Sequence, residues 1–263
     1  MKRLVLPLVV LLAIAAAVAA AWFVLNRSFG GGGSLRGGEM TSEQRTLPPF
    51  TGIAIDGLAE VTLVQGSAEE IRFDIPAKQL GRVRVNVRDG TLHIENGSTG
   101  NFWTLLLGGS MRPLRATITF RDLDRVEVAG SVKLRVDGWK TQKLALSVSG
   151  EGTMRITGLD TKELAIAASG AVKAEIAGRA TDQRIAISGA GDYRAAGLVS
   201  DNARVAVSGA GKVFVNATKT LKVSISGAGS VDYLGDPKVT QEISGMGRVK
   251  RRESAREPLH GIA

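Results

Sequence analysis

The sequence predicts an all-β protein whose main body is a parallel β-solenoid, and three observations support this prediction. A short Ser-Gly phrase recurs through the second half of the chain at intervals of 18 to 20 residues. Apolar residues alternate with polar residues on both sides of each phrase, as they do in half-buried strands. Glycine is also abundant: the 263 residues include 33 glycines, nearly twice the roughly 7% of an average protein.

Residues 1–27 have the pattern of an export segment. A basic start, Met1-Lys2-Arg3, precedes an uncharged apolar run over residues 4–25, which we expect to be helical. Small-residue sites such as Ala17-Val18-Ala19 are typical of a cleaved signal peptide. The length of the run equally allows a signal anchor that spans the membrane. Under either interpretation the rest of the chain is exported to the periplasm or cell envelope, and membrane contact occurs only through residues 4–25 if they are retained.

Residues 28–45 form the second region, a glycine-rich linker that includes Gly30-Gly31-Gly32-Gly33-Ser34. We expect the folded β-domain to occupy residues 46–250. The last region, residues 251–263, is basic, and we expect it to be a disordered tail that either solubilises the end of the domain or contacts anionic lipid or glycan.

Each repeat is expected to run strand, glycine bend, strand, turn. About 20 residues at roughly 3.3 Å each give a contour of about 65 Å, which suits one coil of a solenoid in which equivalent side chains stack. Glycine fits inside a sharp corner and adopts backbone conformations that other residues avoid. The expected corner glycines are Gly130, Gly150, Gly170, Gly189, Gly209, Gly227 and Gly245. An antiparallel β-sandwich is the alternative fold, but it does not keep these columns in register.

The front half of the domain, up to residue 128, repeats less visibly but also alternates. Its Asp89-Gly90 pair is typical of a β-hairpin turn and predicts local antiparallel pairing. We expect this part to cap or begin the same solenoid.

Several ordered motifs together resemble the auto-transporter adhesin head GIN domain family (DUF2807) over about residues 46–250. The motifs are Leu47-Pro48-Pro49-Phe50-Thr51-Gly52-Ile53, the stretch from Gly57 to Gly66, Asp89-Gly90-Thr91-Leu92-His93-Ile94, the serial Ser-Gly-Ala-Gly phrases, and Tyr233-Leu234-Gly235-Asp236-Pro237-Lys238-Val239. The resemblance implies a single-stranded right-handed parallel β-helix, an exported envelope protein and an adhesin-like role. It brings no catalytic residues with it.

The composition argues against several kinds of site. The chain has no cysteine, which excludes disulfides, thiol catalysis and cysteine-ligated metals, and its only histidines are His93 and His260. We therefore expect no cofactor and no metal site. From residue 28 onward the net charge is 31 − 25 = +6, a surplus that is either a solvated surface or an attraction to anionic surfaces. Because the basic residues are scattered and lack interleaved aromatics, we expect no nucleic-acid partner.

Sharper chemical interpretations of the repeat are weak. A phosphate loop requires a helix after the glycines, whereas strands follow here, and a calcium-binding β-roll requires a carboxylate in every turn. A Ser-His-Asp arrangement would have to use one of the two histidines. A polysaccharide-degrading β-helix would need paired carboxylates, and the candidate acids form no obvious stack along the coils. These candidates are Asp122, Asp124, Asp137, Glu151, Glu163 and Glu175.

An apolar segment at residues 101–110 departs from the family pattern. It either forms an exposed patch that contacts a partner or membrane surface, or plugs an open end or side of the solenoid. The residues that would form the patch are Phe102, Trp103, Leu105, Leu106 and Leu107.

The sequence therefore predicts an exported envelope protein that acts as a binding, adhesin-like or scaffold module without enzymatic activity. Expected partners are an envelope glycan, a cell-wall polymer or another surface protein. The alternatives are a polysaccharide-degrading enzyme and a passive structural protein that self-associates through edge strands. The oligomeric state is left open.

Overall fold

The computed structural model describes residues 40–76, 83–96 and 113–253, and the account below concerns these ranges. They belong to one unit, Met40–Ala263, and every regular element in them is a strand. None of them forms a helix long and apolar enough to cross a membrane. The expected export helix, at residues 4–25, lies outside these ranges. The strands are β1 (Met40–Thr46), β2 (Gly52–Gln65), β3 (Glu70–Pro76), β4 (Val83–Arg88), β5 (Thr91–Asn96), β6 (Leu114–Phe120), β7 (Arg125–Val148), β8 (Glu151–Ala168), β9 (Ala171–Ile187), β10 (Ala190–Val207), β11 (Ala210–Ile225), β12 (Ser230–Leu234), β13 (Lys238–Ile243) and β14 (Arg248–Arg251).

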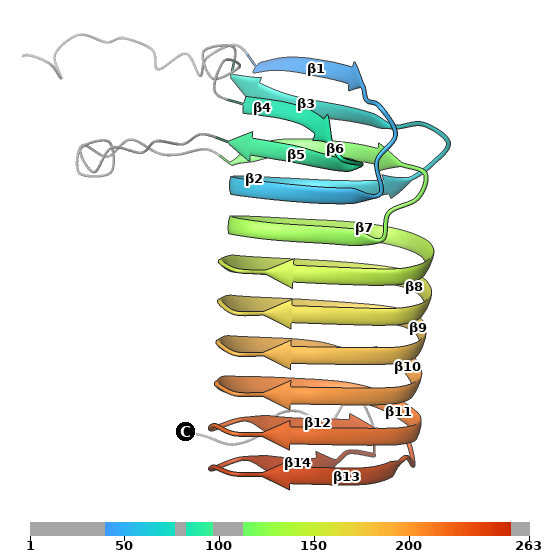
Figure 1. Cartoon of the computed structure of the whole chain (residues 1–263), viewed down its shortest axis with the longest axis vertical. Coiled ribbons are helices and arrows are strands. Elements are labelled where there is room, and N and C mark those ends of the chain that lie inside the picture. The colour runs from blue at the N-terminus through green and yellow to red at the C-terminus, as the bar shows by residue number, and fades with distance from the viewer. Residues whose placement is uncertain (1–39, 77–82, 97–112, 254–263) are drawn as a thin grey trace, which may run out of the picture. The chain divides into compact units, whose positions relative to one another are not determined.

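The strands from β7 to β11 form a stack of parallel coils, each of which bends around the core and returns one step further along (Figure 1). Equivalent positions of successive repeats pair directly: Leu134 pairs with Met154, Met154 with Ala174, and Ala174 with Tyr193. Parallel pairing between consecutive repeats is incompatible with an antiparallel sandwich. The predicted parallel β-solenoid is therefore confirmed.

The core is a set of apolar columns that run through the stack. In β8 and β9 nearly every second residue is buried, as the alternation in the sequence predicts. One column consists of Val148, Ala168, Ile187, Val207 and Ile225, each at most 4% exposed. Full burial of one such Val or Ile side chain is worth about 1.5–3 kcal/mol, so the columns supply the main favourable term for folding.

We expected glycine at the corners for two reasons, lack of room for a side chain and an unusual backbone conformation, and the second holds at few of them. Among them, Gly130 has a positive φ of 100°, whereas Gly150 does not. A Cβ on Gly150 would overlap the carbonyl oxygen of Gly130 in the neighbouring coil, and the same overlap recurs between later corners. Positive φ angles occur instead at turn glycines further along the coil, such as Gly138 and Gly158. The corners therefore require glycine mainly because two backbones approach closely.

Antiparallel strands cap the N-terminal end, as the front half of the sequence predicts. Strand β3 pairs antiparallel with both β1 and β6, and β4 forms a hairpin with β5 through Asp89 and Gly90. Both turn residues have positive φ, at 50° and 69°, which is the signature of a type I′ turn. The first strand begins at Met40, inside the region expected to be linker, so regular structure precedes Thr46.

Regular pairing at the C-terminal end extends beyond residue 250. Strand β14 pairs with β12, and the N–H of Arg252 donates to the carbonyl of Tyr233. The Arg252 guanidinium lies 3.2 Å from a carboxylate oxygen of Asp232, and both side chains are largely buried. Arg251 pairs with Asp236 at 3.0 Å. The first residues of the expected tail therefore close the last coil.

Replacing a corner glycine is expected to destabilise the whole stack. Gly150→Ala should lower the free energy of unfolding by about 1–3 kcal/mol, because the new methyl group overlaps backbone that cannot move away. The matched control is Gly197→Ala, whose Cβ would meet only Ala177, with its Cβ at 3.1 Å and its Cα at 3.7 Å. Urea unfolding should show the larger loss for Gly150→Ala, and equal losses would contradict the close-approach explanation.

Candidate functional site

A shallow groove runs along one outer face of the stack, over the strand segments that precede the corners. It consists of two adjoining hollows of about 760 and 590 Å³. We call it the lateral groove. Three columns of outward-facing residues form it across successive coils. They are a serine row (Ser149, Ser169, Ser188, Ser208, Ser226), a floor (Ser147, Ala167, Ala186, Ala206, Ser224) and an outer row (Ala145, Ala165, Arg184, Arg204, Lys222).

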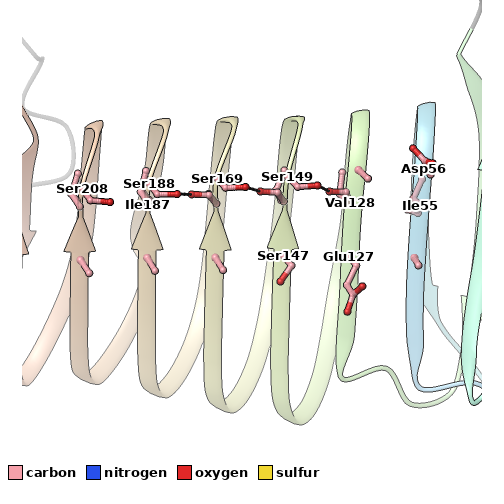
Figure 2. A pocket seen from close by; sticks show the side chains of 18 of the residues that line it. Ile55, Asp56, Glu127, Val128, Ser147, Ser149, Ser169, Ile187, Ser188 and Ser208 are labelled. Carbon is pink, nitrogen blue, oxygen red and sulfur yellow. Dashed lines mark hydrogen bonds between the residues drawn. The ribbon is translucent and has the colours of Figure 1, made fainter. Parts of the chain in front are cut away.

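The serine row is held in place by hydrogen bonds between coils. Figure 2 shows Ser149, Ser169, Ser188 and Ser208 aligned across the ribbons. The Oγ of Ser149 donates to the carbonyl of Val128 at 3.3 Å, and the two serines that follow make equivalent bonds of 3.5 and 3.4 Å. Because each of these hydroxyl groups donates to backbone, its oxygen lone pairs remain available to accept hydrogen bonds from a ligand.

The floor of the groove is made of very small side chains. Ala167, Ala186 and Ala206 are directly paired in register and are all exposed. Their methyl groups leave the hollow open, and they offer an apolar surface without the large side chains that usually insert into a membrane.

The outer row carries three stacked cations. Arg204 pairs in register with Arg184 on one side and with Lys222 on the other, and all three are exposed. Adjacent strands lie about 4.8 Å apart, so the three backbones span about 10 Å. Within the described ranges, none of these side chains forms an ion pair. We call this set the basic row.

Several cations on the other faces have acidic partners. Arg155 lies 2.7 Å from Glu175 in the next coil, and Lys219 lies 2.8 Å from Asp201. The hydrogen bond from Lys219 holds the pKa of the Asp201 carboxyl below its usual range. Arg155 also stacks on Arg135, but both of these arginines have an acidic partner. The basic row differs in that its like charges stack without such partners, which is unfavourable between neighbouring strands.

The N-terminal end of the groove is acidic. Asp56 of β2 pairs in register with Glu95 of β5, and Glu127 and His93 lie close by. The acids here were not among the residues that we expected from the sequence, because parallel pairing of β2 with β5 joins segments about 40 residues apart. The described residues contain no cluster of three or more acids and histidines that would hold a metal ion.

The acids that we considered from the sequence lie away from this groove. Asp137, Glu163 and Glu175 form ion pairs with basic residues, and none of the three lines the groove. Asp122 and Asp124 are exposed in the connection between β6 and β7, and Glu151 is exposed just after a corner. The structure therefore does not bring them together as a catalytic pair.

The predicted apolar patch and the corner glycines are not among the described residues that line this groove. Phe102, Trp103, Leu105, Leu106 and Leu107 lie outside the described residues, as does His260, so their roles stay predictions. The corner glycines from Gly150 to Gly227 follow directly after the residues of the serine row, and none of them lines the groove.

One buried polar cluster lies in the core rather than in the groove. Gln183 donates to Ser200 at 2.5 Å and accepts from Tyr193 at 3.4 Å, and all three are at most 3% exposed. Burial raises the pKa of the Tyr193 phenol. Because its members bond to each other or to backbone and are closed to solvent, this cluster is structural.

Comparison with known proteins now identifies the family. The sequence profile of DUF2807, described as the putative auto-transporter adhesin, head GIN domain, matches residues 49–237. The chain belongs to this family. No curated protein matches the DUF2807 chain.

Solved structures share the fold. A crystal structure of a putative adhesin from Bacteroides fragilis superposes with a TM-score of 0.72 at 19% identity, covering 81% of this chain and 97% of that one. A putative lipid binding protein from Parabacteroides distasonis superposes with a TM-score of 0.62 at 16% identity, covering 83% of this chain and 98% of that one. A putative adhesin from the same species superposes with a TM-score of 0.60 at 20% identity, covering 82% of this chain and 98% of that one. At these identities the likeness establishes the fold of the DUF2807 chain and nothing finer.

Neutralising the centre of the basic row is expected to stabilise the fold. Arg204→Gln should raise the free energy of unfolding by about 0.2–1 kcal/mol, because it removes two like-charge contacts between neighbouring strands. The matched control Arg155→Gln loses its ion pair with Glu175 and also one like-charge contact with Arg135, so these two small effects offset and stability should be unchanged or slightly lower. Urea unfolding at low salt compares them. A greater loss for Arg204→Gln than for Arg155→Gln would show that the basic row is structural.

A paired acid on another face predicts a pH dependence. Hydrogen bonding to Lys133 holds the pKa of Glu60 below its ordinary value of 4.5. Because folding lowers the pKa of this carboxyl, the ionised group stabilises the folded state at any pH above the ordinary pKa. This stabilisation disappears as the pH falls through the lowered pKa. Glu60→Gln should therefore lower the free energy of unfolding by less than about 1 kcal/mol at pH 7 and leave it unchanged in strong acid. Glu151→Gln is the control. Urea unfolding curves in which Glu60→Gln loses the same stability at pH 7 and in strong acid would contradict the assignment.

Proposed function

We propose that this chain is an exported, non-catalytic binding module of the cell envelope with an adhesin-like role, and that the lateral groove is its contact surface. The observation that carries this proposal is the repetition of the same hydroxyl and cationic groups along a rigid, open groove. Membership of a family described as adhesin heads supports the same class of function. The expected partner is an envelope glycan, a cell-wall polymer or another surface protein.

The arrangement of the groove favours binding over catalysis. Three hydroxyls of the serine row donate to backbone carbonyls, so they are oriented by the coil and not activated by a base. The central floor carries only alanine and serine, and the acids lie at the two ends, with Asp56 and Glu127 at one and Glu242 at the other. A surface of this kind supplies many weak, regularly spaced contacts, which suits recognition of an extended ligand.

Export rests on the N-terminal pattern of the sequence. A basic start followed by the apolar run over residues 4–25 is typical of a signal peptide or a signal anchor. We propose that the domain functions in the periplasm or on the outer surface, tethered to the inner membrane if this segment is retained.

A second candidate function is passive self-association through the C-terminal end of the stack. Strand β13 is mostly exposed, and its Ile243 is 38% exposed. Met246, in the connection to β14, is 88% exposed. An exposed edge strand is a template for pairing with a second copy. Molecular mass that rises with protein concentration would favour this function over a monomeric binder.

Blocking the groove tests the proposed function. Ala206→Trp places a large ring on the exposed floor, whereas Ala210→Trp places the same ring on an exposed position beyond the corner. Full-length protein in mild detergent is incubated with cell-envelope fragments, and the retained protein is measured. We expect Ala206→Trp to lose most of the retention and Ala210→Trp to keep it. Retention of the unmodified protein no greater than background would refute the binding function.

A further inference from the structure

We infer that the lateral groove binds a linear acidic polysaccharide whose carboxylates lie along the basic row of Arg184, Arg204 and Lys222. This inference rests on the proposed binding function and names the chemical class of the ligand. Four features of the groove carry it: the unpaired charge, its spacing, the groups opposite it, and the acidic end.

The charge of the row calls for an anionic partner. Three cations stand next to one another on adjacent strands, and no described residue forms an ion pair with any of them. Two acids just outside the groove have other partners: Asp182 accepts a hydrogen bond from Asn202, and Glu163 pairs with Lys143. Glu242, which pairs in register with Ser224 and lines the C-terminal end of the groove, forms no ion pair with the row in the described ranges. An anion on the row would relieve the repulsion between the cations. Arginine suits a carboxylate partner, because its planar guanidinium bonds both carboxylate oxygens at once.

The spacing of the row favours a polymer over a small anion. The cations repeat at the coil spacing of about 4.8 Å, along the axis of the stack. This distance is comparable to the length of one hexopyranose unit in an extended chain. An acidic polysaccharide lying along the groove therefore carries its carboxylates along the same axis, in units that repeat at a similar interval.

The other two columns suit sugar rings. The exposed methyl groups of Ala167, Ala186 and Ala206 match the apolar C–H face of a pyranose ring. The serine row, on the far side of this floor, offers hydroxyl groups to the sugar hydroxyls. Among the described residues that line the groove there is no phenylalanine, tyrosine or tryptophan on which nucleobases would stack, and the one imidazole, His93, lies at the acidic end. No long apolar side chain of this lining is exposed for insertion into a bilayer.

The acidic end of the groove limits where the polyanion lies. Asp56, Glu95 and Glu127 repel carboxylates at the N-terminal end. The basic row lies further along the stack, on the coils of β9, β10 and β11. At the other end of the groove, Glu242 follows the floor next to Ser224 and also repels carboxylates. The charged part of the polymer is therefore confined to the coils of β9, β10 and β11.

The test compares two probes and two variants. The probes are polygalacturonate and its fully methyl-esterified form, which has the same backbone without the charge. The groove variant is Arg184→Gln/Arg204→Gln/Lys222→Gln, and the control is Lys173→Gln/Lys212→Gln/Arg248→Gln, which removes the same charge from exposed positions on the other side of the corner. Binding to the full-length protein in mild detergent is measured by titration calorimetry at low and physiological salt. We expect the groove variant to bind polygalacturonate at least about tenfold more weakly and the control to change little.

Each other result overturns the inference in a different way. Equal binding of the esterified probe would show that charge is not recognised, and equal losses in both variants would show diffuse attraction to a basic protein. Preferential binding to vesicles that contain anionic lipid would assign the basic row to a membrane surface. Failure to bind polygalacturonate, with envelope fragments still retained in a groove-dependent way, would refute the acidic glycan while leaving the proposed function intact. Loss of both would refute the two together.

Discussion

The rest of the structure depends on the close approach of the chain to itself at the corners of the coils. The backbone of Gly150 lies against that of Gly130, and Gly170 lies against Gly150 in turn, with no room for a Cβ between them. The N–H of Ala171 donates to the carbonyl of Gly150 at 3.0 Å, so hydrogen bonding between coils continues through the corner. Because a shift by one residue would place a side chain at this contact, the corners keep all coils in one register.

This register turns a property of one repeat into a property of a whole surface. A serine before each corner becomes a row of hydroxyl groups, and the alanines become a continuous floor. Three cations that are unremarkable in single repeats become a basic row, because Arg184, Arg204 and Lys222 occupy the same position of the coil. The lateral groove therefore needs no loop or insertion. It arises from small side chains in one outward column and larger ones beside it.

The candidate site was only partly predictable from the sequence. The serines were visible in the repeated phrase, but they entered our interpretation as markers of a bend. The basic row had a signal as well: each of Arg184, Arg204 and Lys222 stands five positions before the leading glycine of its repeat. That signal is weak, since the neighbouring repeats carry Ala145 and Ala165 at this position. Without the structure, nothing indicated that this column borders a hollow.

The sequence by itself determined the class of fold, because alternation and a repeat of about 20 residues are local patterns that only stacked strands satisfy. It also determined the positions of the corners and the hairpin at Asp89 and Gly90. Only the tertiary structure decided why the corners are glycine and which residues line the groove. It also placed Asp56 beside Glu95 at the acidic end. The physical reason is that these features depend on contacts between different coils. Residues far apart in the chain meet at these contacts, and local sequence patterns do not indicate which distant residues will be neighbours.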